Sequence, residues 1–156
     1  MKPELVDKFP GMAALEVIYE DYARDCTRCG LHKSRNEVVF GTGCSEDPDV
    51  AFIGDAPSRD DDQKGYPFQG PDGKLLDKML AAMGYDRTKV YLLSAISCKP
   101  RRSPTKTSLK SCWPIMASQL RAVRPRVIVC LGAVAAKQLL QRPGTVDNFR
   151  NSWYRS

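Results

Sequence analysis

The sequence lacks the segments that would direct it to a membrane or to the secretory pathway. No apolar run approaches the roughly 20 residues that cross a bilayer. The N-terminus has no basic stretch followed by an apolar core, so residues 1–11 are predicted to form a flexible tail rather than a signal peptide. We therefore expect a cytoplasmic protein with no membrane partner. A reducing compartment also disfavours disulfides between the six cysteines.

Histidine and internal repetition are scarce as well. His32 is the single histidine and stands beside a cysteine pair, so we interpret it as a surface or supporting residue and not as a catalyst. No repeat, low-complexity tract or linker divides the 156 residues. A chain of this length can bury one core, and we expect a single domain over residues 1–156.

Basic residues, in contrast, are in excess. The chain has 24 Lys and Arg against 18 Asp and Glu, which gives a formal net charge of +6. Such a balance favours an anionic partner through long-range attraction, and nucleic acid is the first candidate.

Four cysteines form the most informative pattern. Cys26 and Cys29 form a C-x-x-C pair, and Cys98 and Cys112 follow far downstream. Two thiolates from the local pair and two distant ones can complete a four-sulfur shell, which is typical of both 4Fe–4S clusters and structural zinc. Their spacing alone leaves both open. Cys44 and Cys130 match no ligand position, and Cys130 is expected in the core.

The distant cysteines flank a basic segment. A cationic loop pinned by a metal centre suits a polyanion, although a solvated charged face is the alternative. We expect phosphate contacts from Lys99, Arg101, Arg102, Ser103 and Lys106.

Apolar strands alternate with amphipathic helices along the chain. Continuous apolar runs indicate buried strands at residues 49–54, 89–94 and 126–131, and helical patterns cover residues 12–24, 73–83, 109–123 and 132–140. This order predicts an α/β fold, a three-layer αβα sandwich around a mostly parallel sheet. Pro114 is expected to be tolerated only in the first turn of its helix.

Two further expectations concern the loops. Residues 58–71 are polar and predict a surface loop, in which Asp60, Asp61 and Asp62 form a solvated acidic run or, as the alternative, a Mg²⁺ site. Functional groups of such sheets gather at the carboxyl ends of the strands. Those ends carry residues 54–58, residues 94–98 and Gly132.

A series of motifs follows in fixed order over about residues 26–153. They are Cys26-Thr-Arg-Cys29-Gly-Leu31, Arg35, Val39-Phe-Gly41, Phe52-Ile-Gly-Asp-Ala-Pro57, Gly65-Tyr-Pro-Phe-Gln-Gly70, Gly73-Lys-Leu-Leu-Asp77, Cys98-Lys-Pro100, Cys112 and Arg126-Val-Ile-Val-Cys-Leu-Gly132. In this order they resemble the iron–sulfur uracil-DNA glycosylases, the family 4 branch of that superfamily.

The resemblance implies a DNA-repair glycosylase that flips a uracil or related deaminated base out of DNA and hydrolyses its N-glycosidic bond. It also implies a 4Fe–4S cluster in preference to zinc. Phe68 would stack on the base, and Gly54 and Ala56 would offer backbone contacts to its oxygens. Asp55 would orient water or stabilise the sugar cation, and Ser94 would contact the base edge, so both are catalytic candidates.

The chain departs from the family pattern at three places. Asp55 replaces the usual Glu, and Ser94 replaces an Asn whose amide reads the base edge. The histidine-containing loop implied beyond residues 150–154 has no counterpart in these 156 residues. These departures motivate an alternative, a non-catalytic iron–sulfur DNA-binding protein that serves replication or repair complexes. An electron carrier that uses the cluster is a third hypothesis. In either of the first two we expect a monomer associated with the nucleoid.

Overall fold

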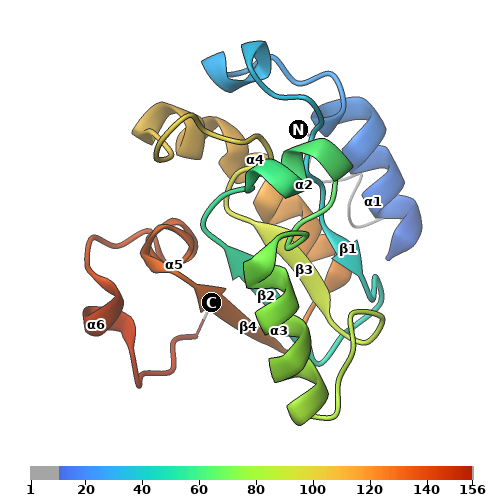
Figure 1. The fold of residues 1–156 in the computed structure, drawn as a ribbon, viewed down its shortest axis with the longest axis vertical. Coiled ribbons are helices and arrows are strands. Elements are labelled where there is room, and N and C mark those ends of the chain that lie inside the picture. Colours follow the sequence, from blue (N-terminus) through green and yellow to red (C-terminus); the bar gives the residue numbers. More distant parts are fainter. Residues whose placement is uncertain (1–10, 156) are drawn as a thin grey trace.

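The computed structural model describes residues 11–155, and a four-stranded sheet forms its centre (Figure 1). The predicted tail at residues 1–11 therefore lies outside the described residues, except for Gly11. The sheet order is β1-β3-β2-β4; β2 pairs in parallel with β3 and β4, and β1 pairs antiparallel with β3. The strands are β1 (Thr42–Gly43), β2 (Val50–Gly54), β3 (Tyr91–Ser94) and β4 (Val127–Leu131).

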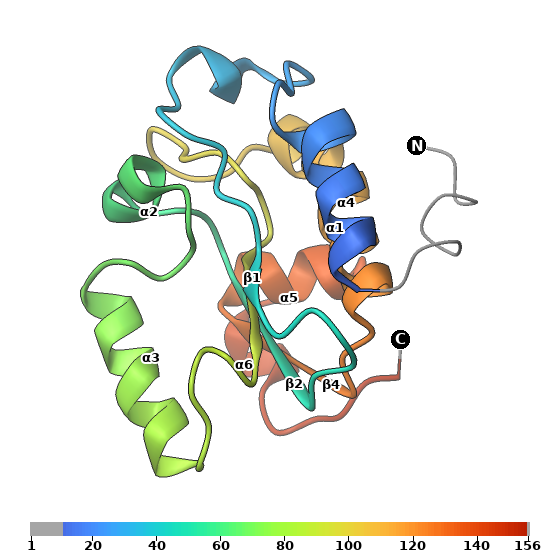
Figure 2. The same cartoon turned by 90° about the vertical axis from the view of Figure 1, so that its right-hand side faces the viewer.

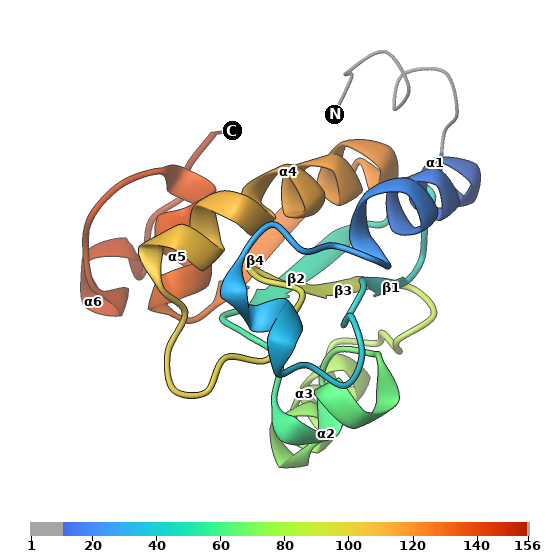
Figure 3. The ribbon, with the colours of Figure 1, turned by 90° about the horizontal axis from the view of Figure 1, so that it is seen from above.

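Helices cover both faces of the sheet. One face carries α1 (Met12–Ile18), α4 (Lys106–Val123) and α5 (Ala133–Leu140), and the other carries α2 (Arg59–Lys64) and α3 (Pro71–Ala82). Figures 2 and 3 show the sheet between these layers, with α3 on one side and α1 and α4 on the other. The predicted three-layer αβα sandwich with a mostly parallel sheet is confirmed.

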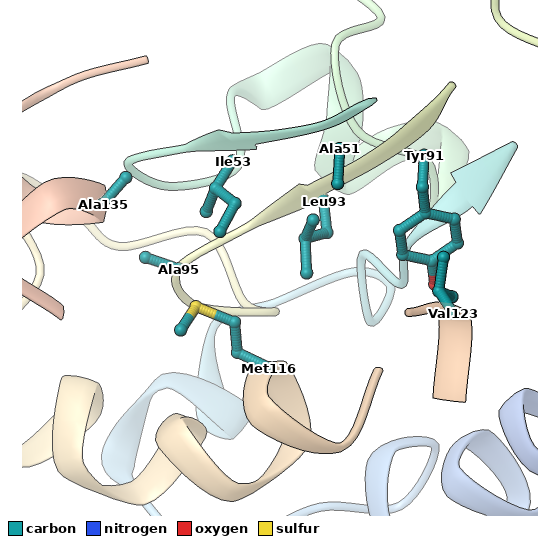
Figure 4. Packing of buried hydrophobic residues seen from close by; sticks show 8 residues of the cluster. All are labelled: Ala51, Ile53, Tyr91, Leu93, Ala95, Met116, Val123 and Ala135. Atoms are coloured by element: carbon teal, nitrogen blue, oxygen red, sulfur yellow. The ribbon is translucent and has the colours of Figure 1, made fainter. Parts of the chain in front are cut away.

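Alternate strand residues supply the two cores, because successive side chains of a strand point to opposite faces. Ala51, Ile53, Tyr91 and Leu93 pack toward α4, where Met116 and Val123 meet them (Figure 4). On the other face the strand residues contact Phe68 and α3; this second cluster contains Phe52, Leu92, Val90, Phe68, Leu76 and Leu80. A third cluster joins α1 to α4 through Ile18 and Ile115.

The segment predicted as a surface loop at residues 58–71 contains a helix, so that expectation is wrong for α2. Ser58 caps α2: its hydroxyl accepts from Asp61 N at 3.2 Å, and Asp61 Oδ2 accepts from Ser58 N at 2.9 Å. Asp61 and Asp62 are buried rather than solvated. Asp62 accepts from both the backbone N and the side-chain nitrogen of Asn36. These carboxylates serve the protein's own N–H groups, and within residues 11–155 no acidic group suited to a metal ion is found.

Pro114 lies well inside α4, and not in its first turn as predicted. A proline at this place removes the hydrogen bond to the carbonyl of Lys110 and costs roughly 3 kcal/mol in a helix interior. The neighbouring Cys112, Ile115, Met116 and Gln119 are all buried, so packing offsets this cost.

The remaining elements are short, and the first of them lies within the helical pattern of residues 12–24. The α1 helix continues into a π-helical turn, η2 (Tyr19–Ala23), and a 3₁₀ turn, η3 (Gly30–Lys33), follows the C-x-x-C pair. A last helix, α6 (Val146–Phe149), lies near the C-terminus. Across the described part of the chain, each helix is too short or too polar to cross a membrane.

Candidate nucleic-acid site and cysteine centre

The carboxyl ends of β2, β3 and β4 lie side by side. Gly54 is in register with Ser94 on one side and with Leu131 on the other. The ladder continues past β3, where Ala95 N donates to Gly54 O at 2.8 Å. Because parallel strands end at one edge of the sheet, residues that follow these ends converge there.

Phe68 lies directly over this edge. A Cβ atom added to Gly54 would come within 2.9 Å of Phe68 Cζ and 3.7 Å of Ser94 Oγ. Only glycine therefore leaves room for the ring. The structure thus brings together Gly54, Phe68 and Ser94, three of the four residues predicted to bind the base. Phe68 and Ser94 are each 8% exposed.

The backbone of Phe68 adopts a left-handed conformation, with φ 57°, which is uncommon for an aromatic residue. Arg87 holds it there: Nη2 donates to Phe68 O at 2.6 Å, and Nε donates to Asp77 Oδ1 at 2.6 Å. A Cβ at Gly73 would lie 1.8 Å from Phe68 O, so α3 can begin this close to the loop only with glycine there. Sequence reasoning missed Arg87, because no motif marks a residue that acts on a backbone carbonyl nearly 20 positions away.

Asp61 links the two loops that border the edge. Its Oδ1 accepts from Gln69 N at 2.6 Å, next to Phe68, and its Oδ2 accepts from Ser58 N. One buried carboxylate therefore ties the segment after β2 to the Phe68 loop. The acidic run at residues 60–62 predicted a solvated Asp61, so this role was not expected from the sequence.

Asp55 turns toward the start of α5. Its Oδ1 accepts from Ala135 N at 2.8 Å, and a Cβ at Gly132 would come within 2.4 Å of the carboxylate. Gly132 has φ 136°, a conformation that also favours glycine. The amino end of a helix favours a negative charge, so the start of α5 is a favourable place for this side chain beside the strand ends. Ala56, the fourth predicted base-binding residue, is half-buried in the same loop.

The four predicted metal ligands are free thiols that interact electrostatically. Burial raises the pKa of Cys98, and it raises the pKa of Cys112 to about 11; the nearby Cys26 and Cys29 thiols add to both shifts. Across residues 11–155 no group of three or more His, Cys, Asp or Glu side chains could hold a single metal ion. A 4Fe–4S cluster makes a different demand, because each of its four thiolates binds a different iron and the sulfurs lie further apart. The C-x-x-C segment and the start of α4 lie at the same end of the molecule, at the top of Figures 1 and 2.

Arginine lies next to this thiol set. Arg28 Nε donates to Cys26 Sγ at 3.2 Å, while its backbone carbonyl accepts from Ser111 Oγ of α4 at 3.3 Å. Burial alone would raise the pKa of Cys26, but this hydrogen bond and the charges of Arg28 and Arg35 together hold it below its ordinary value. Unpaired thiols beside N–H donors are a donor set that fits an iron–sulfur cluster, whose sulfurs accept such hydrogen bonds.

The basic loop between Cys98 and α4 is open to solvent. Arg101, Arg102, Ser103 and Lys106 are exposed, and Lys99 is half-buried. None of these side chains takes part in an ion pair within the described residues. The cationic groups are thus available to an anionic partner.

A large hollow lies elsewhere and contains none of the predicted site residues. It has a volume of about 970 Å³ and runs along β4, between that strand and the segment of residues 142–155. We rank the strand-end edge above it as the candidate site, because only the edge carries the converging glycine, aromatic and polar groups.

Comparison with known proteins assigns the class. The family model of the uracil DNA glycosylase superfamily matches residues 40–154, so the chain belongs to this superfamily, as its motifs predicted.

Within the superfamily, the chain is similar to proteins named type-4 uracil-DNA glycosylase. It is 45% identical to that of Archaeoglobus fulgidus over 114 residues (72% of this chain, 57% of the relative). It is 36% identical to that of Thermotoga maritima over 120 residues (76% and 62%). It is 33% identical to that of Pyrobaculum aerophilum over 123 residues (78% and 62%). The chain therefore spans about three fifths of the length of these relatives.

Proposed function

We propose that this protein removes uracil, or a related deaminated base, from DNA by hydrolysing the N-glycosidic bond. The convergence of Gly54, Phe68 and Ser94 at the strand ends is the observation that carries the proposal. The similarity to type-4 uracil-DNA glycosylases supports it.

A base inside a duplex is out of reach, so the target nucleotide must leave the stack. The Phe68 ring would stack on the flipped base, and the Ser94 hydroxyl would contact its polar edge. Backbone N–H groups of the loop from Gly54 to Ala56 would face its carbonyl oxygens. Such donors favour catalysis because the leaving base gains negative charge as the bond breaks.

The sugar gains positive charge in the same step. Asp55 would stabilise that cation as a fixed carboxylate, held by Ala135 N at the start of α5. The base departs with the electron pair of the broken bond, and a water molecule adds its oxygen to C1′. The proton that the water loses neutralises the departed base. The site needs no covalent intermediate with the protein.

The thiols of Cys26, Cys29, Cys98 and Cys112 would hold a 4Fe–4S cluster. Iron–thiolate bonds would join the C-x-x-C segment to the start of α4 and so fix the basic loop between them. Lys99, Arg101, Arg102, Ser103 and Lys106 would then contact DNA phosphates. Zinc in the same four thiolates, the alternative from the sequence, is less favoured, because within residues 11–155 no three of these side-chain types are placed to hold one ion. We further predict that the protein is a monomer and that it acts in the cytoplasm on the DNA of the nucleoid.

A glycosylase assay tests the proposal directly. The purified protein is incubated with single- and double-stranded DNA that contains one uracil, and abasic sites are revealed by alkaline cleavage. We expect abasic product at the uracil position and none with thymine in its place. Absence of product with both substrates would remove the enzymatic proposal.

A second candidate function is non-catalytic DNA binding, with a role beside replication or repair proteins. Ser94 favours it, because one hydroxyl cannot present the paired donor and acceptor of an amide. Salt-sensitive DNA binding without base release would support this function. Turnover in the assay above would exclude it.

A further inference from the structure

The guanidinium of Arg35 joins three segments around the cysteine centre. Its Nη1 donates to the carbonyl of Cys26 at 2.7 Å and also to Cys98 Sγ at 3.4 Å. Its Nη2 donates to the carbonyl of Arg24 at 3.1 Å. The side chain therefore contacts the end of the N-terminal helical segment, the C-x-x-C pair and a cysteine 63 positions further along the chain.

These contacts suit arginine in particular. A planar guanidinium presents five N–H groups in a fixed fork, so it can serve two carbonyls and one sulfur together. Lysine would bring the charge on a flexible stem without this geometry. The backbone supports the arrangement, since Arg35 N donates to Leu31 O at 3.2 Å directly after η3. Arg35 is half-buried, which limits the alternative positions of its side chain.

Arg28 makes an instructive contrast. It also donates to a cysteine sulfur, but it is exposed, and its second donor bond goes to the carbonyl of Tyr22. Both of its side-chain contacts thus remain within one short stretch of chain. Of the two arginines, Arg35 alone reaches from the local pair to a distant ligand.

We propose that Arg35 is a positioning residue for the cysteine centre: its side chain sets Cys98 in register with the C-x-x-C pair and donates a hydrogen bond to the Cys98 sulfur when the cluster is bound. This inference rests on the proposed iron–sulfur cluster. Hydrogen bonds to ligand sulfurs are among the factors that set the potential of such clusters. A cationic donor stabilises the more negative, reduced state, so the potential is raised by Arg35.

The test uses the full chain, purified anaerobically and reconstituted with iron and sulfide. Arg35→Gln removes the charge and part of the fork, and Arg35→Lys keeps the charge alone. Arg24→Ala is the matched control, because that side chain is exposed, pairs with Glu20 and contacts no sulfur. The readouts are iron per protein, the rate of cluster loss to a chelator, and the reduction potential measured by film voltammetry.

We expect cluster loss to be several-fold faster in Arg35→Gln and intermediate in Arg35→Lys, with a lower potential for the clusters that remain. Arg24→Ala should match the unsubstituted protein. If both Arg35 variants retain iron at the control rate and keep its potential, the inference is overturned. Should Arg35→Gln fail to fold, Arg35→Lys decides the question alone. Failure of the unsubstituted protein to bind iron would overturn the cluster itself, which is a different and separable result.

Discussion

Strands β3 and β4 are similar in sequence but differ in burial. Tyr91–Ser94 is buried throughout, with Leu92 at 0% exposure, whereas all residues of Val127–Leu131 are only half-buried. The cause is position in the sheet. β3 has a neighbouring strand on each side, while β4 borders the 970 Å³ hollow and is the last strand of the described sheet. An apolar run thus indicates a strand with both faces covered, but it does not show whether that strand lies in the middle or at the edge of the sheet.

Leucine truncation should give the largest difference between the two strands. Leu92→Ala removes a fully buried side chain and should lower the free energy of unfolding by about 3 kcal/mol. Leu131→Ala, with the same chemistry on β4 and the same cluster as neighbour, should cost about 1 kcal/mol, because less of its surface leaves water on folding. Urea unfolding of both variants measures the two values. Equal losses would show that β4 is covered in solution.

The Asp61 carboxylate gives the next largest effect. Asp61→Asn leaves one oxygen acceptor for the two backbone N–H groups of Ser58 and Gln69, so one buried donor loses its partner. The expected loss of stability is about 2 kcal/mol. Asp147→Asn, in the exposed C-terminal region, is the control, and its weak ion pair with Arg150 should matter by less than about 0.5 kcal/mol. A thermal unfolding series compares them, and similar melting temperatures would count against the tie between the two loops.

The burial of Asp61 also shows which features of the fold the sequence predicts and which it does not. The strands at residues 50–54, 91–94 and 127–131 could be predicted because apolar periodicity reflects local backbone geometry and burial. The meeting of Gly54 with Ser94 followed, since parallel strands end at one edge. The burial of Asp61 and Asp62 could not be predicted, because their partners are backbone N–H groups brought near only by the complete fold. An acidic run has the same composition whether solvated or capping a helix.

Other contacts in the site could not be predicted for the same reason: their partners are distant along the chain and meet only in the folded protein. Arg87 donates a hydrogen bond to the carbonyl of Phe68. No motif in the sequence around Arg87 predicts this contact. The direction of Asp55 toward Ala135 depends on the close approach of α5 to β2, which Gly132 permits. Cys130 was expected in the core, but it lies half-buried on β4 because the strand borders the hollow. Composition identifies candidates, and packing decides what each one contacts.

A substitution at Phe68 can separate the packing role of this side chain from its proposed stacking role. Phe68→Leu retains an apolar side chain against Leu76 and Leu80, so stability should fall by only about 1 kcal/mol. The aromatic face is lost, however, and base stacking contributes about 1–3 kcal/mol, so base release should slow by roughly 10- to 100-fold. Single-turnover kinetics with uracil-containing DNA measure this rate. Leu131→Ala is the control, because it should lose a similar amount of stability. If base release is as slow in Leu131→Ala as in Phe68→Leu, the slower rate reflects lost stability and not lost stacking.

The smallest expected effect compares the exposed arginines of the two regions. Arg101 and Arg102 lie in the loop after Cys98, whereas Arg142 and Arg155 border the hollow along β4. Each phosphate contact releases counterions and contributes about 0.9 to the slope of log affinity against log salt concentration on duplex DNA. The variant with Arg101→Ala and Arg102→Ala should therefore bind with a slope shallower by about 1 to 2, while the variant with Arg142→Ala and Arg155→Ala should keep the original slope.

Both variants lose the same formal charge, so long-range attraction is matched and only direct contact can separate them. Fluorescence anisotropy at a series of salt concentrations gives the slopes, and a loss confined to the Arg142 and Arg155 variant would move the DNA-binding surface from the cysteine centre to the edge of the sheet.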